Sequence, residues 1–235
     1  MFKRSVQRNA LLARIALAVF SISQSSLTLP AQTNSTESKW EADIKTFEAS
    51  DKTNPPPKGA ILFVGSSSIR LWKTMAQDFP EHRVINRGFG GSQLADSVAF
   101  ADRIVISYRP KMVLLYAGDN DIAAGKPPEQ VFADFKSFVQ RIQAALSETR
   151  IAYISIKPSL ARWRLVEKIK AANQLIEAYS RKNDKLMFID VFTPMLGSDG
   201  EPRKELFVPD GLHLNAKGYE LWNSVVKPFL EKQPR

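Results

Sequence analysis

Apolar segments of two lengths alternate along most of this chain. Some are short and apolar at nearly every position, which is typical of strands buried on both faces of a parallel sheet. Five segments have this pattern: Ala60–Val64, Val84–Ile85, Met112–Tyr116, Ile151–Ile156 and Leu186–Val191. Longer segments between them repeat apolar residues at intervals of three and four, as amphipathic helices do. These predicted helices are Trp40–Ser50, Leu71–Phe79, Leu94–Tyr108, Pro128–Ser147, Leu165–Lys182 and Ala216–Glu231.

The alternation of strands and helices predicts an α/β fold, in which a single five-stranded parallel sheet is the middle layer of an α/β/α sandwich. The sequence shows neither an internal repeat nor a second domain. In such a sheet the loops that follow the strands meet at the carboxyl edge, where ligands bind. Polar residues in these loops are therefore the first candidates for function.

The first 31 residues differ in composition from the rest of the chain. Before the first acidic residue, Glu37, there is an apolar segment at 15–22 and there are four basic residues: Lys3, Arg4, Arg8 and Arg14. This pattern predicts a secretory signal peptide over residues 1–31, followed by a linker and an N-terminal helix over residues 32–58. Export to the periplasm or out of the cell is expected. An uncleaved anchor and an amphipathic transit sequence are the alternatives, and the weak site at residues 29–31 leaves the cleavage position open.

The composition excludes several kinds of function. The chain has no cysteine, so disulfides and thiolate chemistry are impossible, and its histidines are His82 and His213 alone. A structural zinc site is therefore not expected. The net charge of +9 falls to about +5 without the four basic residues of the leader (9 − 4), and no dense basic run is present. Binding to nucleic acid is not expected. The apolar segment of the leader is too short to predict a membrane span, and the oligomeric state stays open.

Four loops bring polar or glycine-rich groups to the carboxyl edge of the predicted sheet. In chain order, the groups are Ser66–Ser68, Gly88–Gly91, Asp119–Asp121, and Asp210 with His213. Acyl transfer by a serine needs a base for the hydroxyl proton, an acid to orient that base, and donors for the oxyanion. His213 can be the base, and Asp210, three residues earlier, can fold back onto its imidazole. Backbone N–H groups of the serine loop and of Gly91, with the amide of Asn120, can donate to an oxyanion.

Each of these loops also has a purely structural interpretation. Serines and an Asp-x-x-His pair often cap helices, and glycines often make turns. The aspartates around Asn120 could belong to a calcium loop, but the twelve-residue pattern fails after Asp121. His82 lies in a polar connector and is predicted to be a solvated surface residue. The catalytic interpretation is favoured because all four groups fall in the right loops and in the right order.

In these four blocks the sequence resembles the SGNH, or GDSL-like, hydrolases. The resemblance covers about residues 60–230 and is carried by Gly65–Ser68, Asn86–Gly91, Gly118–Asp121 and Asp210–His213. It implies a flavodoxin-like sandwich over residues 59–235 and hydrolysis of carboxylic esters without metal or cofactor. By the same resemblance, Ser67 would be the nucleophile, His213 the base and Asp210 its orienting acid. Gly91 and Asn120, with the N–H of Ser67, would form the oxyanion hole.

Two positions depart from the family pattern. Ser66 stands where the family has its namesake aspartate, which removes a polar anchor of the loop but leaves the assignment of the nucleophile intact. Asp119 is acidic where a small or neutral residue is usual, and a carboxylate beside the oxyanion site would disfavour negative charge there. We therefore predict that Asp119 points away from the Ser67 hydroxyl. The nucleophile-elbow pattern of general α/β-hydrolases fails, because Ile69 occupies the position of its last glycine.

The sequence thus predicts an exported serine esterase that cleaves carboxylic esters through an acyl-serine intermediate. Short acyl groups on carbohydrate are the favoured substrate, because no long apolar lid is predicted. The alternatives are a lysophospholipase or lipase-type acylhydrolase and a catalytically silent carbohydrate- or lipid-binding protein on the same fold. Trp163 follows the fourth strand and could stack on a sugar ring above the site, or simply pack.

Overall fold

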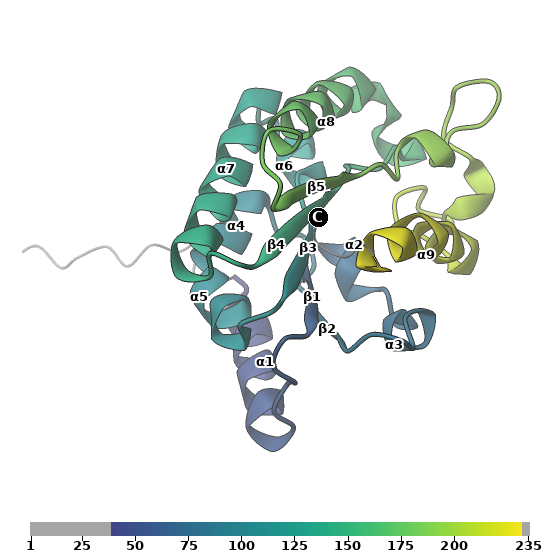
Figure 1. Cartoon of the computed structure of the whole chain (residues 1–235). Coiled ribbons are helices and arrows are strands. Elements are labelled where there is room, and N and C mark those ends of the chain that lie inside the picture. The colour runs from purple at the N-terminus through teal and green to yellow at the C-terminus, as the bar shows by residue number, and fades with distance from the viewer. Residues whose placement is uncertain (1–38, 232–235) are drawn as a thin grey trace, which may run out of the picture. The chain divides into compact units, whose positions relative to one another are not determined.

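The five predicted strands form one parallel sheet in the computed structural model, which describes residues 39–231 (Figure 1). In spatial order the strands are β2 (Val84–Gly88), β1 (Ile61–Gly65), β3 (Met112–Tyr116), β4 (Arg150–Ile154) and β5 (Leu186–Ile189). All four pairings are parallel, and the order is that of flavodoxin-like folds. The predicted fold class is therefore confirmed. The predicted signal peptide and the beginning of the linker lie outside the described residues.

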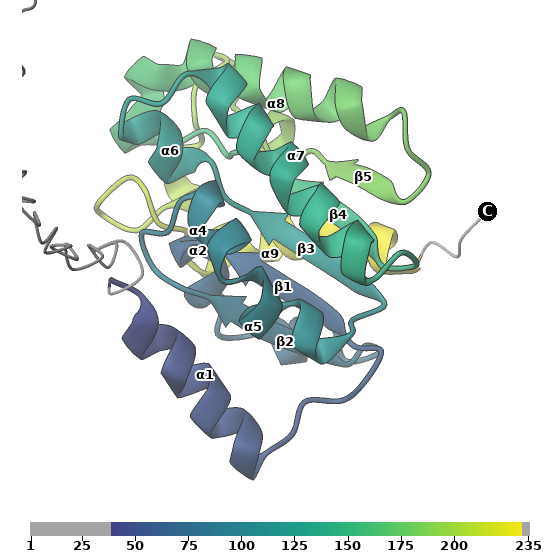
Figure 2. The same ribbon diagram turned by 90° about the vertical axis from the view of Figure 1, so that its left-hand side faces the viewer.

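Helices cover both faces of the sheet (Figures 1 and 2). One face is covered by α1 (Glu41–Thr53), α4 (Leu94–Ala99), α5 (Ala101–Ile104), α6 (Asp119–Ala123), α7 (Pro128–Ala145) and α8 (Val166–Ser180). The other face is covered by α2 (Ser67–Arg70), α3 (Met75–Asp78) and α9 (Ala216–Glu231). Short 3-10 turns are η1 (Ile106–Tyr108), η2 (Leu160–Leu165), η3 (Thr193–Met195) and η4 (Lys204–Leu206). Within residues 39–231, no helix combines the length and the apolar character needed to cross a bilayer.

Alternate residues of each strand point to opposite faces of the sheet and build two cores. In β1, Leu62 and Val64 join the core beneath α1, α7 and α8, whereas Ile61 and Phe63 join the core beneath α3 and α9. All four side chains are fully buried. The uninterrupted apolar run that predicted this strand is thus the consequence of helices on both sides.

Aromatic rings dominate the core beneath α3 and α9. The ring of Trp72 lies 5.4 Å from those of Phe79 and Tyr219 and 6.0 Å from that of Trp222, measured between centroids. Tyr219 also donates a hydrogen bond of 2.9 Å to the backbone oxygen of Ser68. These contacts hold α9 against α2, the short helix that follows the first strand.

The predicted helix Leu71–Phe79 was wrong in its position. The chain instead forms α2, which begins at Ser67, and α3, with a turn between them. In that turn the carboxylate of Asp78 accepts hydrogen bonds from the indole N–H of Trp72 (2.5 Å) and from the hydroxyl of Thr74 (2.7 Å). These bonds tie two residues of the turn to the last residue of α3.

The predicted helix Leu94–Tyr108 is divided into α4, α5 and η1. Helical geometry is lost at Phe100 (φ −93°, ψ 4°) and again at Val105 (φ −131°, ψ −62°). Phe100 and Val105 are both buried in the core beneath α7. The helical period thus predicted the extent of the segment but not these two breaks.

His82 is not the solvated residue that the sequence predicted. Its side chain is partly buried, and its Nε2 has no hydrogen-bond partner among residues 39–231. It precedes β2 and therefore lies at the amino edge of the sheet, away from the loops that carry the candidate site. Of the two histidines, only His213 is placed for chemistry at the carboxyl edge.

Candidate active site

The first loop of the site depends on Gly65, the last residue of β1. Its φ of 134° is in the region that favours glycine, and a Cβ atom there would lie 1.9 Å from the carbonyl oxygen of Tyr116. The N–H of Ser66 donates to that same oxygen (3.0 Å). The sharp turn makes Ser67 the first residue of α2, at the carboxyl end of β1, one of the inner strands of the sheet. Ser66, which replaces the family's aspartate, is buried and makes no side-chain cap.

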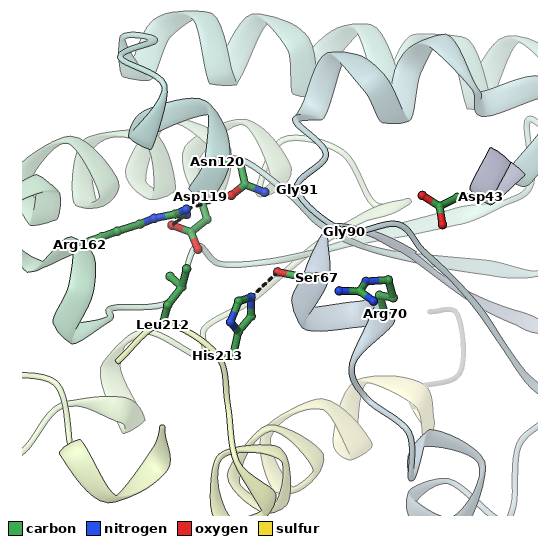
Figure 3. A pocket seen from close by; sticks show the side chains of 10 residues that line it. All are labelled: Asp43, Ser67, Arg70, Gly90, Gly91, Asp119, Asn120, Arg162, Leu212 and His213. Carbon is green, nitrogen blue, oxygen red and sulfur yellow. Dashed lines mark hydrogen bonds and ion pairs between the residues drawn. The ribbon is translucent and has the colours of Figure 1, made fainter. Parts of the chain in front are cut away.

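A chain of hydrogen bonds joins Ser67, His213 and Asp210 (Figure 3). The Oγ of Ser67 lies 3.1 Å from Nε2 of His213, and Nδ1 of His213 lies 2.6 Å from Oδ2 of Asp210. The other carboxylate oxygen of Asp210 accepts the N–H groups of Leu212 (2.8 Å) and His213 (2.9 Å). A carboxylate can only accept from Nδ1, so Nε2 presents its lone pair to the serine hydroxyl.

The same contacts keep Asp210 ionised. Burial acts to raise the pKa of Asp210, but the hydrogen bonds from the backbone and imidazole of His213 and from the backbone of Leu212 outweigh it. Together with the charge of the imidazole, they lower the pKa to about 2. A carboxylate that stays charged can both fix the tautomer of the imidazole and stabilise an imidazolium.

The glycine loop after β2 is held by side chains on both of its sides. The side chain of Asn86 accepts the N–H of Gly88 (2.9 Å) and donates to the carbonyl of Ile69 in α2 (2.7 Å). The indole of Trp40 donates to the carbonyl of Gly90 (2.9 Å). Gly91 has a positive φ of 76° and open space around its Cα. Its N–H makes no hydrogen bond within residues 39–231, so it is free to donate to a ligand.

The amide of Asn120, in α6, has an orientation that its partners determine. Its Nδ2 donates to the carbonyl of Ser92 (2.9 Å), and its Oδ1 accepts from Nη2 of Arg162 (3.1 Å). A carbonyl cannot donate and a guanidinium cannot accept, so the opposite amide orientation would break both bonds. The second N–H of Asn120 is left for a ligand in the pocket.

Asp119 lies beside Asn120 and forms a buried ion cluster. Its carboxylate is 3.2 Å from Nζ of Lys157 and 2.6 Å from Nη1 of Arg162. Nζ of Lys157 also lies 3.1 Å from the hydroxyl of Tyr116. Burial acts to raise the pKa of Asp119, but the charges of Lys157 and Arg162 outweigh it and lower the pKa. The cations thus engage both oxygens of the extra carboxylate, and the carboxylate makes no hydrogen bond to the hydroxyl of Ser67, although both residues line the same pocket.

Residues 63–221, more than half of the chain, match the family model of the GDSL-like lipase/acylhydrolases. The chain belongs to this family. The resemblance noted in the sequence is confirmed, and the protein is a hydrolase of carboxylic esters. No curated protein matches the chain of this acylhydrolase in sequence.

Solved structures share the fold of this acylhydrolase at low sequence identity. A GDSL-like lipase from Bacteroides thetaiotaomicron has a TM-score of 0.70 and 23% identity, and the match covers 81% of this chain and 98% of that one. A carbohydrate esterase of family 3 from Talaromyces cellulolyticus has a TM-score of 0.58 and 16% identity, over 72% and 95%. An acetyl esterase mutant with an acetate ion gives 0.58 and 16%, again over 72% and 95%. These similarities establish the fold.

The pocket of the acylhydrolase opens above Ser67 and has a volume of about 410 Å³. Its lining includes Gly91, Asn120 and His213, together with residues that the sequence did not single out. Arg70, Asp43 and Arg162 are the charged additions (Figure 3).

Trp163 does not line the pocket but packs against the core beneath α7 and α8. Of the two interpretations of this tryptophan, the structure favours packing. Its neighbour Arg162 is the residue of this loop that reaches the site. A sequence signal for the cluster existed in Lys157, a charged residue directly after a buried strand, where an ion partner is expected.

Proposed function

We propose that the protein is an exported esterase that removes short acyl groups, acetyl foremost, from carbohydrate through an acyl-Ser67 intermediate. The observation that carries the proposal is the polarity of the pocket. Among its described lining residues Leu212 is the single large apolar side chain, and charged and amide groups form most of the remainder. Such walls offer hydrogen bonds to sugar hydroxyls, and Leu212 is the one large apolar side chain among them that a long acyl chain could contact.

In the proposed reaction His213 removes the proton of Ser67 while the serine oxygen attacks the ester carbonyl. Asp210 holds the Nδ1–H and stabilises the imidazolium that forms. The N–H groups of Ser67 and Gly91 and the amide of Asn120 donate to the oxygen that becomes negative. The imidazolium then protonates the leaving alcohol, which departs and leaves the acyl group on the serine.

Water completes the cycle. His213 takes a proton from a water molecule whose oxygen attacks the acyl carbonyl, and the same donors hold the second oxyanion. Collapse of this intermediate breaks the bond to Ser67, returns the proton to the serine oxygen and releases the carboxylic acid. No group besides the described side chains and water is needed for the balance of atoms.

The lipase-type alternative is less well supported. A lipase that works at a lipid surface needs a contiguous apolar patch at its mouth. Among residues 39–231 the only exposed large hydrophobic residue is Leu160, with 37% of its surface accessible. Two similar structures are named an acetyl esterase and a carbohydrate esterase, which supports the short-acyl proposal, whereas a third is named a GDSL-like lipase.

Rates on a panel of p-nitrophenyl esters of rising chain length and on acetylated sugars test the proposal. The rate should fall as the acyl chain lengthens. Ser67→Ala and His213→Ala should each lower kcat by about 10³-fold or more. Ser68→Ala is the matched control and should keep the activity, because its hydroxyl is buried beside the site rather than in the pocket. Undiminished activity in Ser67→Ala would exclude the mechanism, and a preference for long chains would exclude the substrate class.

Export is part of the same proposal and rests on the composition of residues 1–31. The test is to recover the protein from outside the cytoplasm and to determine its mass, which shows whether residues 1–31 have been removed. A chain that keeps its first 31 residues and stays inside the cell would contradict this part without affecting the esterase mechanism.

A further inference from the structure

One cation in the pocket has no partner within residues 39–231. The guanidinium of Arg70 makes neither an ion pair nor a hydrogen bond there, although it lines the same pocket as Ser67. Arg162, in contrast, is engaged by Asp119 and Asn120. Arginine presents five N–H donors in a fixed fork that matches the two oxygens of a carboxylate. An exposed fork beside the nucleophile is therefore a candidate for substrate binding.

The fold places Arg70 next to Ser67. Both residues belong to α2, three positions apart, so their side chains lie on the same face of one helical turn, with about 5–6 Å between Cβ atoms. Figure 3 shows the hydroxyl of Ser67 between the imidazole of His213 and the guanidinium of Arg70. When the ester carbonyl of a substrate lies at Ser67, a substituent close to that carbonyl can therefore reach the guanidinium of Arg70.

Two glycines of the neighbouring loop make room for this arginine. A Cβ atom at Gly88 would lie 2.2 Å from the backbone nitrogen of Arg70. A Cβ atom at Gly90 would lie 2.7 Å from its Nε and 3.2 Å from its Cζ. The guanidinium therefore lies against the bare backbone of Gly90, while the residue stays exposed to solvent. Its donors are thus close to the nucleophile and are not neutralised.

The charges of the pocket limit how much negative charge a ligand can carry. Arg70 is the one unpaired cation of the described lining, and the carboxylate of Asp43 lies in the same lining. A phosphate carries a charge of about −1.5 to −2 at neutral pH, which is more than one guanidinium balances, and it would be repelled by the carboxylate of Asp43. We propose that Arg70 is a specificity-determining residue that binds a carboxylate carried by the ester substrate. The proposal rests on the esterase function and adds the charge of the substrate to it.

Matched pairs of esters test the proposal on the wild-type protein and its variants. For a carboxylate on the alcohol part, the pair is 4-acetoxybenzoate and its methyl ester. For a carboxylate on the acyl part, the pair is phenyl hydrogen succinate and phenyl methyl succinate, with background hydrolysis subtracted. The measured quantity is the ratio of kcat/KM for the anionic ester to kcat/KM for the neutral ester, compared between proteins. Comparing ratios cancels the different reactivity of the two esters in a pair.

Arg70→Gln should lower this ratio by about fivefold for one pair, the pair that places its carboxylate at Arg70. Arg70→Lys should lower it less, because it keeps the charge but loses the fork. Gly90→Ala, which displaces the guanidinium, should also lower it. The control is Arg83→Gln, which removes the same charge from an exposed residue at the amino edge of the sheet and should leave both ratios unchanged. Added salt should lower the ratio in the wild type more than in Arg70→Gln.

The outcomes separate the two levels of the proposal. If both ratios stay the same in Arg70→Gln, or fall equally in Arg83→Gln, then Arg70 binds no substrate carboxylate, while the esterase function stands. If the wild-type protein hydrolyses neither member of either pair and no ester of the chain-length panel, then the esterase function fails and the role of Arg70 fails with it.

Discussion

Replacing Asp119 by asparagine would leave the buried ammonium of Lys157 without its carboxylate. The side chains of Lys157 and Asp119 are only 1% and 6% exposed, and their charged atoms are 3.2 Å apart. Asparagine has nearly the same volume, so the substitution removes the charge without opening a cavity. The remaining neighbour of the ammonium is the neutral hydroxyl of Tyr116. The variant therefore measures the cost of leaving the buried Lys157, and in part Arg162, without a carboxylate partner.

The expected loss of folding stability follows from the burial of the ion cluster of Asp119, Lys157 and Arg162. Removing one partner of a buried ion pair costs about 3–5 kcal/mol, because the other charge stays buried without compensation. Arg162 is 18% exposed and can turn toward water, and Tyr116 still accepts from Lys157, so the low end applies. A loss of about 3 kcal/mol corresponds to a melting temperature lower by about 6–12 °C for a domain of this size.

Chemical denaturation at neutral pH measures the loss of stability in Asp119→Asn, and two further variants are measured beside it. Asp102→Asn is the matched control, because Asp102 and Arg141 form an ion pair with side chains 57% and 54% exposed. It should cost less than about 1 kcal/mol. Asp119→Asn combined with Lys157→Met removes both charges and should recover part of the stability, since a buried pair replaced by neutral groups is often tolerated.

The dependence on pH adds an independent check. The pKa of Asp119 is lowered in the folded protein, so its contribution is fully present above the ordinary value of 3.8 and is lost as the pH falls below that value. The difference in stability between the wild type and Asp119→Asn should therefore shrink at acidic pH. Equal stability of Asp119→Asn and Asp102→Asn at neutral pH would refute the argument, because Lys157 would then need no buried partner.

Two further predictions concern groups that position the catalytic residues. Arg162→Gln should lower kcat by about tenfold with little change in KM, because it releases the amide of Asn120, and an oxyanion donor is worth about 10²–10³ in kcat. Steady-state kinetics measure both constants, and a change in KM alone would contradict this prediction. Asp210→Asn should lower kcat by about 10³-fold or more at every pH above about 4. The reason is that the wild-type carboxylate, with a pKa of about 2, is ionised throughout that range. A pH–rate profile in which the wild type and the variant have the same kcat at neutral pH would contradict this prediction.

The sequence predicted the sheet well because its inner strands, β1, β3 and β4, are buried on both faces. A short, continuous apolar run such as Met112–Tyr116 predicts a buried strand, and the structure places this segment in the sheet as β3. Helix boundaries were predicted less well where side chains redirect the backbone. Asp78, the last residue of α3, binds Trp72 and Thr74 in the turn between α2 and α3, and no periodicity of apolar residues contains that information.

The candidate site was predictable as far as the family blocks extend. The structure brings Ser67, His213 and Asp210 into hydrogen-bonding distance and places Gly91 and Asn120 beside them, while their catalytic roles stay a prediction. The family blocks did not predict the cations around the site. Lys157 and Arg162 come from the loop after β4, and their meeting with Asp119 depends on how that loop folds over the sheet edge.

The glycine-rich block has a second role that its resemblance to the family does not express. A glycine in such a block is first explained by the oxyanion hole, and the open space around Gly91 fits that explanation. Gly88 and Gly90 do not, because a side chain at Gly88 would meet the backbone of Ile69 and Arg70, and one at Gly90 would meet the guanidinium of Arg70. In the proposed mechanism the loop therefore serves the chemistry through Gly91, whereas Gly90 leaves room for the cationic group beside the nucleophile. If Arg70 binds a substrate carboxylate, the identity of the residue one turn after the nucleophile predicts the charge of the ester.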